Sequence, residues 1–182
     1  GVALWRRLAG QRPRVFAAPL VTALLVLATV LGEPGDRLAA LAALDEALAV
    51  ARPLAEGSPG RFAPLVGRCY LLQGLRRAES GDDAAAVDAL RDSMAVFRSL
   101  PDNGTAGFAL ERGLAAVMLA AEYGDRDEYA EASAVLSEAL TVLARAPGEN
   151  GSLHAFVLGT AYVLRAMALA GLEDHDAAMQ AF

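Results

Sequence analysis

The residues that could do chemistry in this 182-residue chain are few and far apart. Two histidines, His154 and His175, have no Cys or His partner at the spacing of a metal site. The acidic stretch from Glu122 to Glu131 lacks the ordered oxygen ligands and the closing Glu of a calcium loop. A solvated turn with helix-capping carboxylates explains that stretch. We therefore expect no metal site and no cofactor.

The candidate nucleophiles are equally sparse. The single cysteine, Cys69, lies in an apolar stretch, where we expect a core residue rather than a reactive thiol, and one cysteine excludes an internal disulfide. No Ser or Cys lies in a nucleophile elbow. The chain contains no lysine, so a phosphate-binding loop that ends in Lys-Ser or Lys-Thr is impossible. The sequence predicts a protein that is not an enzyme.

The elements that would position any site repeat every 46 residues. Small residues recur at this spacing in three columns: Ala40, Ala86, Ala132 and Ala178; Ala28, Gly74, Ala120 and Ala166; Ala47, Ser93 and Ala139. A fixed period of this length is typical of a solenoid of stacked units. Because two helix axes that approach closely leave no room for a long side chain, the columns predict helix crossings.

Each unit is predicted to be a helical hairpin. In the second unit Val87, Leu90, Met94 and Phe97 share one helical face, and the first helix of each unit is more apolar all round. We predict helices at residues 16–33, 37–56, 61–80, 83–100, 106–123, 127–146, 152–171 and 175–182.

The turns inside the units share a Gly-Asp pair: Gly35-Asp36, Gly81-Asp82 and Gly124-Asp125. Glycine adopts the left-handed conformation that ends a helix, and aspartate caps the next helix. We therefore expect each pair to end one helix and begin the next.

The pattern of Gly74, Gly81-Asp82 and Ala86 resembles the tetratricopeptide repeat (TPR) family. That family has a small residue inside its first helix, a Gly-Asp type of turn, and an Ala early in its second helix. The resemblance covers the whole chain as a long-period variant, since 46 residues exceed the usual 34 or so. It implies an all-α, right-handed superhelix that binds other proteins and has no catalytic residues.

We expect one TPR-like repeat domain over residues 1–182, with residues 1–9 as the tail of a preceding repeat. The predicted units are residues 10–56, 57–102, 103–148 and 149–182, in a fragment of a longer protein. End faces that carry Trp5 and Phe182 predict self-association, because a solenoid end without a polar cap exposes the face meant for its neighbour.

The formal net charge of −6 argues against direct nucleic-acid binding. The absence of Lys and Ile, which have AT-rich codons, indicates a GC-rich bacterial origin, and we expect a cytoplasmic protein. Residues 15–32 form an uncharged apolar run that follows four arginines, as a membrane span or signal sequence would. The copy of this run in the next unit carries Arg68, Arg76 and Arg77, which favours a buried repeat helix over a membrane span.

First helices line the concave surface of such superhelices. The TPR resemblance places Thr22, Leu25 and Thr29 of the first unit on that surface. From the later units it implies partner-binding residues Arg68, Leu71, Leu75, Leu114, Val117, Val163 and Met167. An apolar groove of this kind suits an amphipathic helix of another protein. The alternative is that longer helices close the groove and bury these residues as core.

Three functions remain open. The first is a non-catalytic scaffold for protein–protein interaction. The second is a sensory or regulatory arm of a multidomain bacterial signalling protein or transcriptional regulator. The third, which depends on residues 15–32 alone, is a membrane-anchored adaptor.

Overall fold

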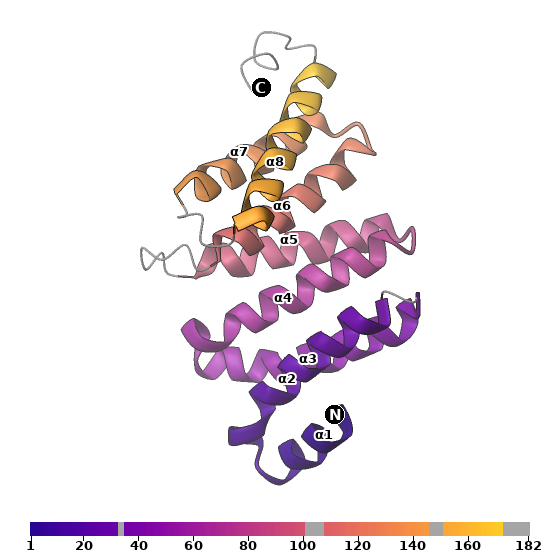
Figure 1. Ribbon diagram of the computed structural model, residues 1–182, viewed down its shortest axis with the longest axis vertical. Helices are drawn as coiled ribbons and strands as arrows, with labels where there is room; N and C mark the ends of the chain where they lie inside the picture. Colours follow the sequence, from indigo (N-terminus) through magenta and orange to yellow (C-terminus); the bar gives the residue numbers. More distant parts are fainter. Residues whose placement is uncertain (33–34, 101–107, 146–150, 173–182) are drawn as a thin grey trace. The chain divides into compact units, whose positions relative to one another are not determined.

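The computed structural model describes residues 1–32, 35–100, 108–145 and 151–172, and every regular element in these ranges is an α-helix (Figure 1). The helices are α1 Val2–Gln11, α2 Pro13–Gly32, α3 Arg37–Gly57, α4 Pro59–Ala78, α5 Asp83–Ser99, α6 Ala109–Gly124, α7 Tyr129–Arg145 and α8 Gly151–Gly171. The all-α class is confirmed, and the predicted bounds agree to within three residues. Helix α1 covers the predicted tail of residues 1–9, whereas the predicted helix 175–182 lies outside the described residues.

The chain divides into two compact units, Gly1–Pro101 and Asp102–Phe182. In the first unit each helix from α1 to α5 packs against the next, and α2 also packs against α4. In the second unit α6, α7 and α8 all pack against one another. Both units therefore place one first helix directly against the next first helix, with a second helix beside them.

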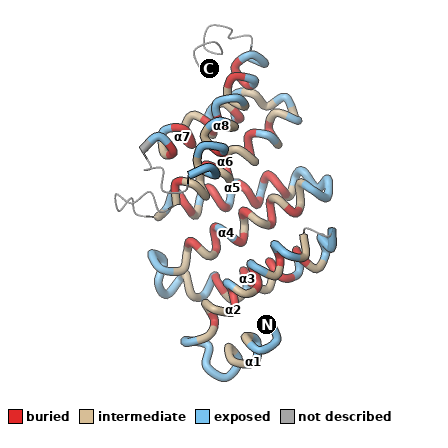
Figure 2. The backbone as a smooth tube through the Cα atoms, in the orientation of Figure 1, coloured by how far each residue is buried: buried red, intermediate tan, exposed pale blue. Residues whose placement is uncertain are grey.

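The small-residue columns are buried wherever the structure describes them. Along α4 and α5, buried positions alternate with more exposed ones (Figure 2). Ala40 and Ala86 are 0% exposed and Ala132 is 2% exposed. The same holds for the large apolar columns: Leu44, Leu90 and Leu136; Leu48, Met94 and Leu140. Ala178, the fourth member of the first column, lies outside the described residues. The repeat register read from the sequence therefore marks the core of both units.

Glycines mark the closest helix crossings. A Cβ atom on Gly74 would lie 2.5 Å from Leu90 Cγ, and one on Gly67 would lie 2.7 Å from Phe97 Cζ. In the second unit a Cβ atom on Gly113 would lie 2.8 Å from Leu143 Cδ1. Gly67 and Gly113 are one repeat apart, as are Phe97 and Leu143. The two units thus repeat the same crossing.

One predicted turn is wrong. Gly35 and Gly81 have φ angles of +88° and +73° and end their helices as predicted. Gly124 has no positive φ, and the left-handed residue of the third turn is Asp127, at φ +59°. Asp127 lies one repeat after Gly81, so the register holds while the residue type changes. A short polar side chain tolerates this conformation better than other non-glycine side chains do.

Candidate protein-binding surface

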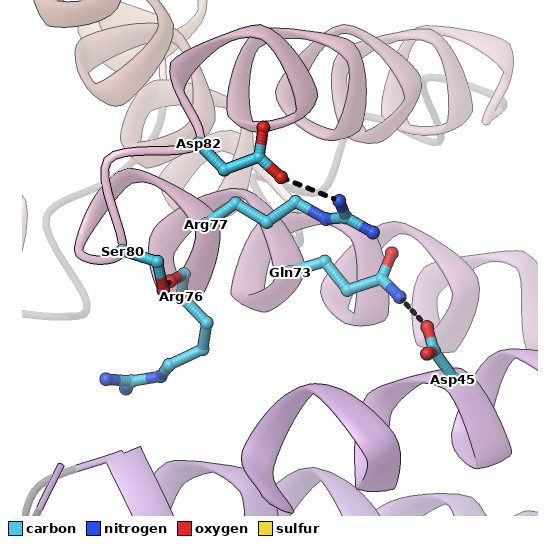
Figure 3. A network of polar contacts seen from close by, with 6 residues as sticks. All are labelled: Asp45, Gln73, Arg76, Arg77, Ser80 and Asp82. Carbon is cyan, nitrogen blue, oxygen red and sulfur yellow. Dashed lines mark hydrogen bonds and ion pairs between the residues drawn. The ribbon is translucent and has the colours of Figure 1, made fainter. Parts of the chain in front are cut away.

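The polar side chains of the first unit form a structural network that joins neighbouring helices (Figure 3). Gln73 Nε2 on α4 donates to Asp45 Oδ1 on α3 over 2.6 Å. Near the end of α4, Ser80 Oγ donates to the Arg76 carbonyl over 2.7 Å, and Arg77 lies 3.4 Å from an Asp82 carboxylate oxygen. These contacts fix α4 against α3 and shape the turn into α5.

Arg76 is the most buried charge of this network, at 6% exposure. Its Nη1 donates to Glu79 over 2.7 Å, and its guanidinium lies against Gly32, where a Cβ atom would clash with it. Gly32 is the last residue of α2, so a positive charge sits at the negative end of that helix dipole. Arg76 therefore serves the packing of α4 on α2.

Cys69 is 0% exposed, which confirms that it belongs to the core. Burial raises the pKa of its thiol from 9.0 to about 12. A thiol with so high a pKa is protonated at neutral pH and is a poor nucleophile. Across the described ranges, no group of three or more His, Cys, Asp or Glu side chains could hold a metal ion.

The predicted partner-binding residues fall into three classes of exposure. Leu71 is 6% exposed and contributes to the core, while Leu75, Leu114 and Val117 are half-buried. The exposed members are Arg68, Val163 (46%) and Met167 (61%). In the second unit, the helices of Leu114 and Val117 and of Val163 and Met167 pack against each other, so one unit contains four of the seven residues.

The first unit contains an apolar groove that the sequence reading did not single out. It has a volume of about 880 Å³ and lies between α1 and α2. Its lining includes Val2 and Trp5 from α1, and Pro19, Ala23, Val26, Leu27 and Val30 from α2. Thr22 also lines the groove, but its hydroxyl donates to the Ala18 carbonyl of its own helix over 3.2 Å. Apart from Gly1 at the start of α1, the lining side chains are therefore apolar or hydrogen-bonded within their own helix.

The repeat register relates the groove to the pair of helices in the next repeat. Val2 and Trp5 correspond to Leu48 and Ala51 in the middle of α3. In the α3–α4 pair, Gln73 of α4 donates a hydrogen bond to Asp45 of α3.

One lining residue sets a chemical preference. Leu27 in the groove occupies the repeat position of Gln73. In the α3–α4 pair, Gln73 donates a hydrogen bond to Asp45. An aspartate placed opposite Leu27 would lose its hydrogen-bonding partner. A helix in the groove should therefore present an apolar side chain at this point.

The surroundings of the groove are basic. Residues 1–32 contain four arginines and no acidic residue, although the whole chain has a net charge of −6. Arg6 pairs with Glu46 of α3 over 2.6 Å, while Arg7, Arg12 and Arg14 are exposed. The segment that forms the groove is therefore basic, although the groove lining itself is mainly apolar.

The second unit exposes an apolar helix face as well. On α8 the exposed large side chains are Leu153, Phe156, Tyr162, Val163 and Met167. Helices α2 and α8 both have the length and composition of a membrane span, and 33% and 28% of their apolar windows are buried within the protein. Most of the exposed large apolar side chains in the described ranges lie on these two helices.

No protein-family model matches the chain, and no curated protein matches it. The fold is similar to a solved structure, BtubC (BKLC) from P. vanneervenii, with a TM-score of 0.66. The similarity covers 99% of this chain and 83% of that one, at 18% sequence identity. At this identity the likeness concerns the fold alone.

Proposed function

We propose that this chain is a non-catalytic protein-binding module of TPR-like helical hairpins, and that it binds an amphipathic helix in the groove between α1 and α2. The apolar groove of about 880 Å³ carries the proposal. An apolar helix face that fills such a groove removes apolar surface of both partners from water.

The partner helix is defined by chemistry. Its inner face is apolar, including the position opposite Leu27, since the Leu27 side chain offers no hydrogen bond to a buried carboxylate. Its outer face is acidic, because residues 1–32, which form the groove, contain four arginines and no acidic residue.

A synthetic peptide tests this proposal directly. Residues 37–57 of the chain, the sequence of α3, supply a helix that packs beside a repeat first helix in this fold. We expect a fluorescently labelled peptide to bind with a rise in anisotropy, and its Asp45→Leu version to bind more tightly because Leu27 then meets an apolar partner.

The matched control is a change in the groove. Val26→Asp places a charge on the groove lining and should weaken binding of both peptides, while the equally exposed Val15→Asp lies outside the lining and should not. The proposal fails if neither peptide binds, or if the Val15 and Val26 variants bind equally well.

A membrane-anchored adaptor is the second candidate, since α2 and α8 have the length and composition of membrane spans. The exposed arginines that precede α2 would then contact anionic headgroups. Flotation with anionic lipid vesicles tests this function. Co-flotation that Val26→Asp abolishes, without peptide binding, would favour the adaptor over the protein-binding module.

A further inference from the structure

The side chain of Arg76 reaches from α4 to the end of α2 in the interior of the first unit. Arg76 is 6% exposed, and it extends away from the Gln73–Asp45 pair (Figure 3). A Cβ atom on Gly32, the last residue of α2, would clash with Arg76 Cζ and Nη1. The guanidinium therefore occupies space that a side chain at position 32 would need.

The other contacts of Arg76 lead to the turn between α4 and α5. Its Nη1 lies 2.7 Å from a carboxylate oxygen of Glu79, the residue that follows α4. Its main-chain carbonyl accepts a hydrogen bond of 2.7 Å from the Ser80 hydroxyl. Arg76 thus connects the end of α2, in the first hairpin, with the turn of the second hairpin.

The buried position of the guanidinium has a cost. Arg76 Nε is shielded from solvent and has no hydrogen-bond acceptor among the described residues. A buried donor without a partner is destabilising, and an arginine that turned into water would avoid this. Because the side chain stays buried against Gly32, its close packing on α2 and the negative end of the α2 dipole must compensate for the cost.

The second unit contains the equivalent junction without this contact. Gly124 ends α6 and lies two repeats after Gly32, while Ala168 on α8 lies two repeats after Arg76. Helices α6 and α8 pack together, yet outside α6 itself no atom of the described residues lies within 4 Å of a Cβ atom on Gly124. The close contact at Gly32 therefore comes from Arg76 and is no general feature of the junction between first helices.

We infer that Arg76 is a latch between the two hairpins of the first unit, α2–α3 and α4–α5, which makes them open together and not one at a time. Neighbouring units of a helical solenoid gain cooperativity through the interface that they share. Arg76 strengthens this interface at one point that contacts both hairpins. The inference is independent of the proposed function, since no partner takes part in it.

A pair of substitutions tests the contact with Gly32. Gly32→Ala alone should lower the urea midpoint, because its methyl group displaces the buried guanidinium. In an Arg76→Ala background the same change should leave the midpoint unchanged or raise it, since alanine favours a helix over glycine. Gly124→Ala is the matched control and should not lower the midpoint in either background. A Gly32→Ala effect that is equal with and without Arg76 would overturn the inference.

The labelling of Cys69 tests the coupling. Cys69 on α4 is 0% exposed and belongs to a core cluster formed mainly by α2 and α3, so its thiol becomes accessible when α2–α3 separates from α4. In the native full chain, Arg76→Ala should speed the reaction of Cys69 with a disulfide reagent about tenfold. Arg77→Ala removes a neighbouring arginine with a longer, more exposed ion pair and should leave the rate unchanged.

A second thiol separates loss of the latch from general destabilisation. Val87 is 1% exposed on α5, and Val87→Cys in a Cys69→Ala background reports opening of the second hairpin. With the latch intact, Cys69 in the parent and the new thiol in this variant should react at similar rates, and Arg76→Ala should speed labelling of Cys69 alone. Equal acceleration of both thiols, or an unchanged Cys69 rate, would contradict the latch.

Discussion

The Phe97 ring of α5 lies directly over Gly67 of α4, where a Cβ atom would come within 2.7 Å of Phe97 Cζ. One repeat later Leu143 covers Gly113 in the same way, at 2.8 Å. Gly159 on α8 holds the same repeat position, but no atom of the described residues lies within 4 Å of a Cβ atom there. Two of these equivalent glycines therefore lie against a side chain of the neighbouring helix, while the third has no such neighbour.

Gly67→Ala should lower the free energy of unfolding by about 1–3 kcal/mol, because the 1%-exposed Phe97 ring has no space into which to move. Gly159→Ala should instead stabilise α8 by up to about 1 kcal/mol, since alanine favours a helix over glycine and meets no neighbour. Urea denaturation measures both. Equal effects at the two sites would show that the Gly67 crossing is no more closely packed than the Gly159 position.

Ala86→Leu and Ala132→Leu should each destabilise the protein by about 1–3 kcal/mol through overpacking. Both alanines belong to the column of small residues and are 0% and 2% exposed. Ala95→Leu on the exposed side of α5 is the control, and it should leave the urea midpoint unchanged. Unchanged midpoints in the two buried variants would mean that the column tolerates a larger side chain and is no helix contact.

Asp127→Val should cost about 1–2 kcal/mol, because a β-branched side chain is strained at a φ of +59°. Asp127→Gly should be tolerated, since glycine occupies the two preceding positions of this column, Gly35 and Gly81. Asp125→Val is the matched control, because Asp125 is exposed and has an ordinary φ of −65°. Thermal melts rank the three variants, and similar losses for both valine variants would argue against backbone strain.

The hydrogen bond from the Tyr129 hydroxyl to Asp127 gives a pH prediction. The bond, 2.6 Å long, raises the pKa of Tyr129 above its ordinary value of 10.0. Because the folded-state pKa is the higher one, this bond stabilises the fold below pH 10 and is lost as the pH rises through the folded-state value. Asp127→Asn should lower the Tyr129 pKa, as measured by NMR titration, and an unchanged pKa would exclude this bond in solution.

Cys69 provides a test of the core by labelling. With a thiol pKa of about 12 and 0% exposure, Cys69 should react with a disulfide reagent at pH 8 only when the first unit opens. The pKa exceeds the ordinary 9.0, so burial of the protonated thiol stabilises the fold below pH 9 and this contribution falls as the pH rises toward 12. Immediate labelling of the native protein would contradict the buried position.

The repeat columns predicted the fold well because burial is periodic. Ala40, Ala86 and Ala132 have the same environment, so their common type could be read without a structure. The third turn was missed because two residue types, Gly and Asp, satisfy the same backbone requirement, and Gly124 happened to lie nearby. The 46-residue spacing therefore predicts the position of this turn better than the residue type does.

The candidate site was predictable only in part. Sequence places Leu71 and Val163 in one column, yet the first is buried and the second exposed, because exposure depends on which neighbouring helix is present. The groove-lining Val26 and Val30 are indistinguishable in sequence from the rest of an apolar helix. The sequence feature that distinguishes this face is the change from Arg76 to Val30 at the same repeat position.

Trp5 emission reports directly on the α1–α2 groove, because this single tryptophan lines it. On titration with the Asp45→Leu peptide of residues 37–57, which contains no tryptophan, we predict a blue shift that saturates with the peptide's anisotropy curve and disappears in Val26→Asp. Saturable peptide binding that leaves Trp5 emission unchanged would place the binding surface elsewhere and contradict the account.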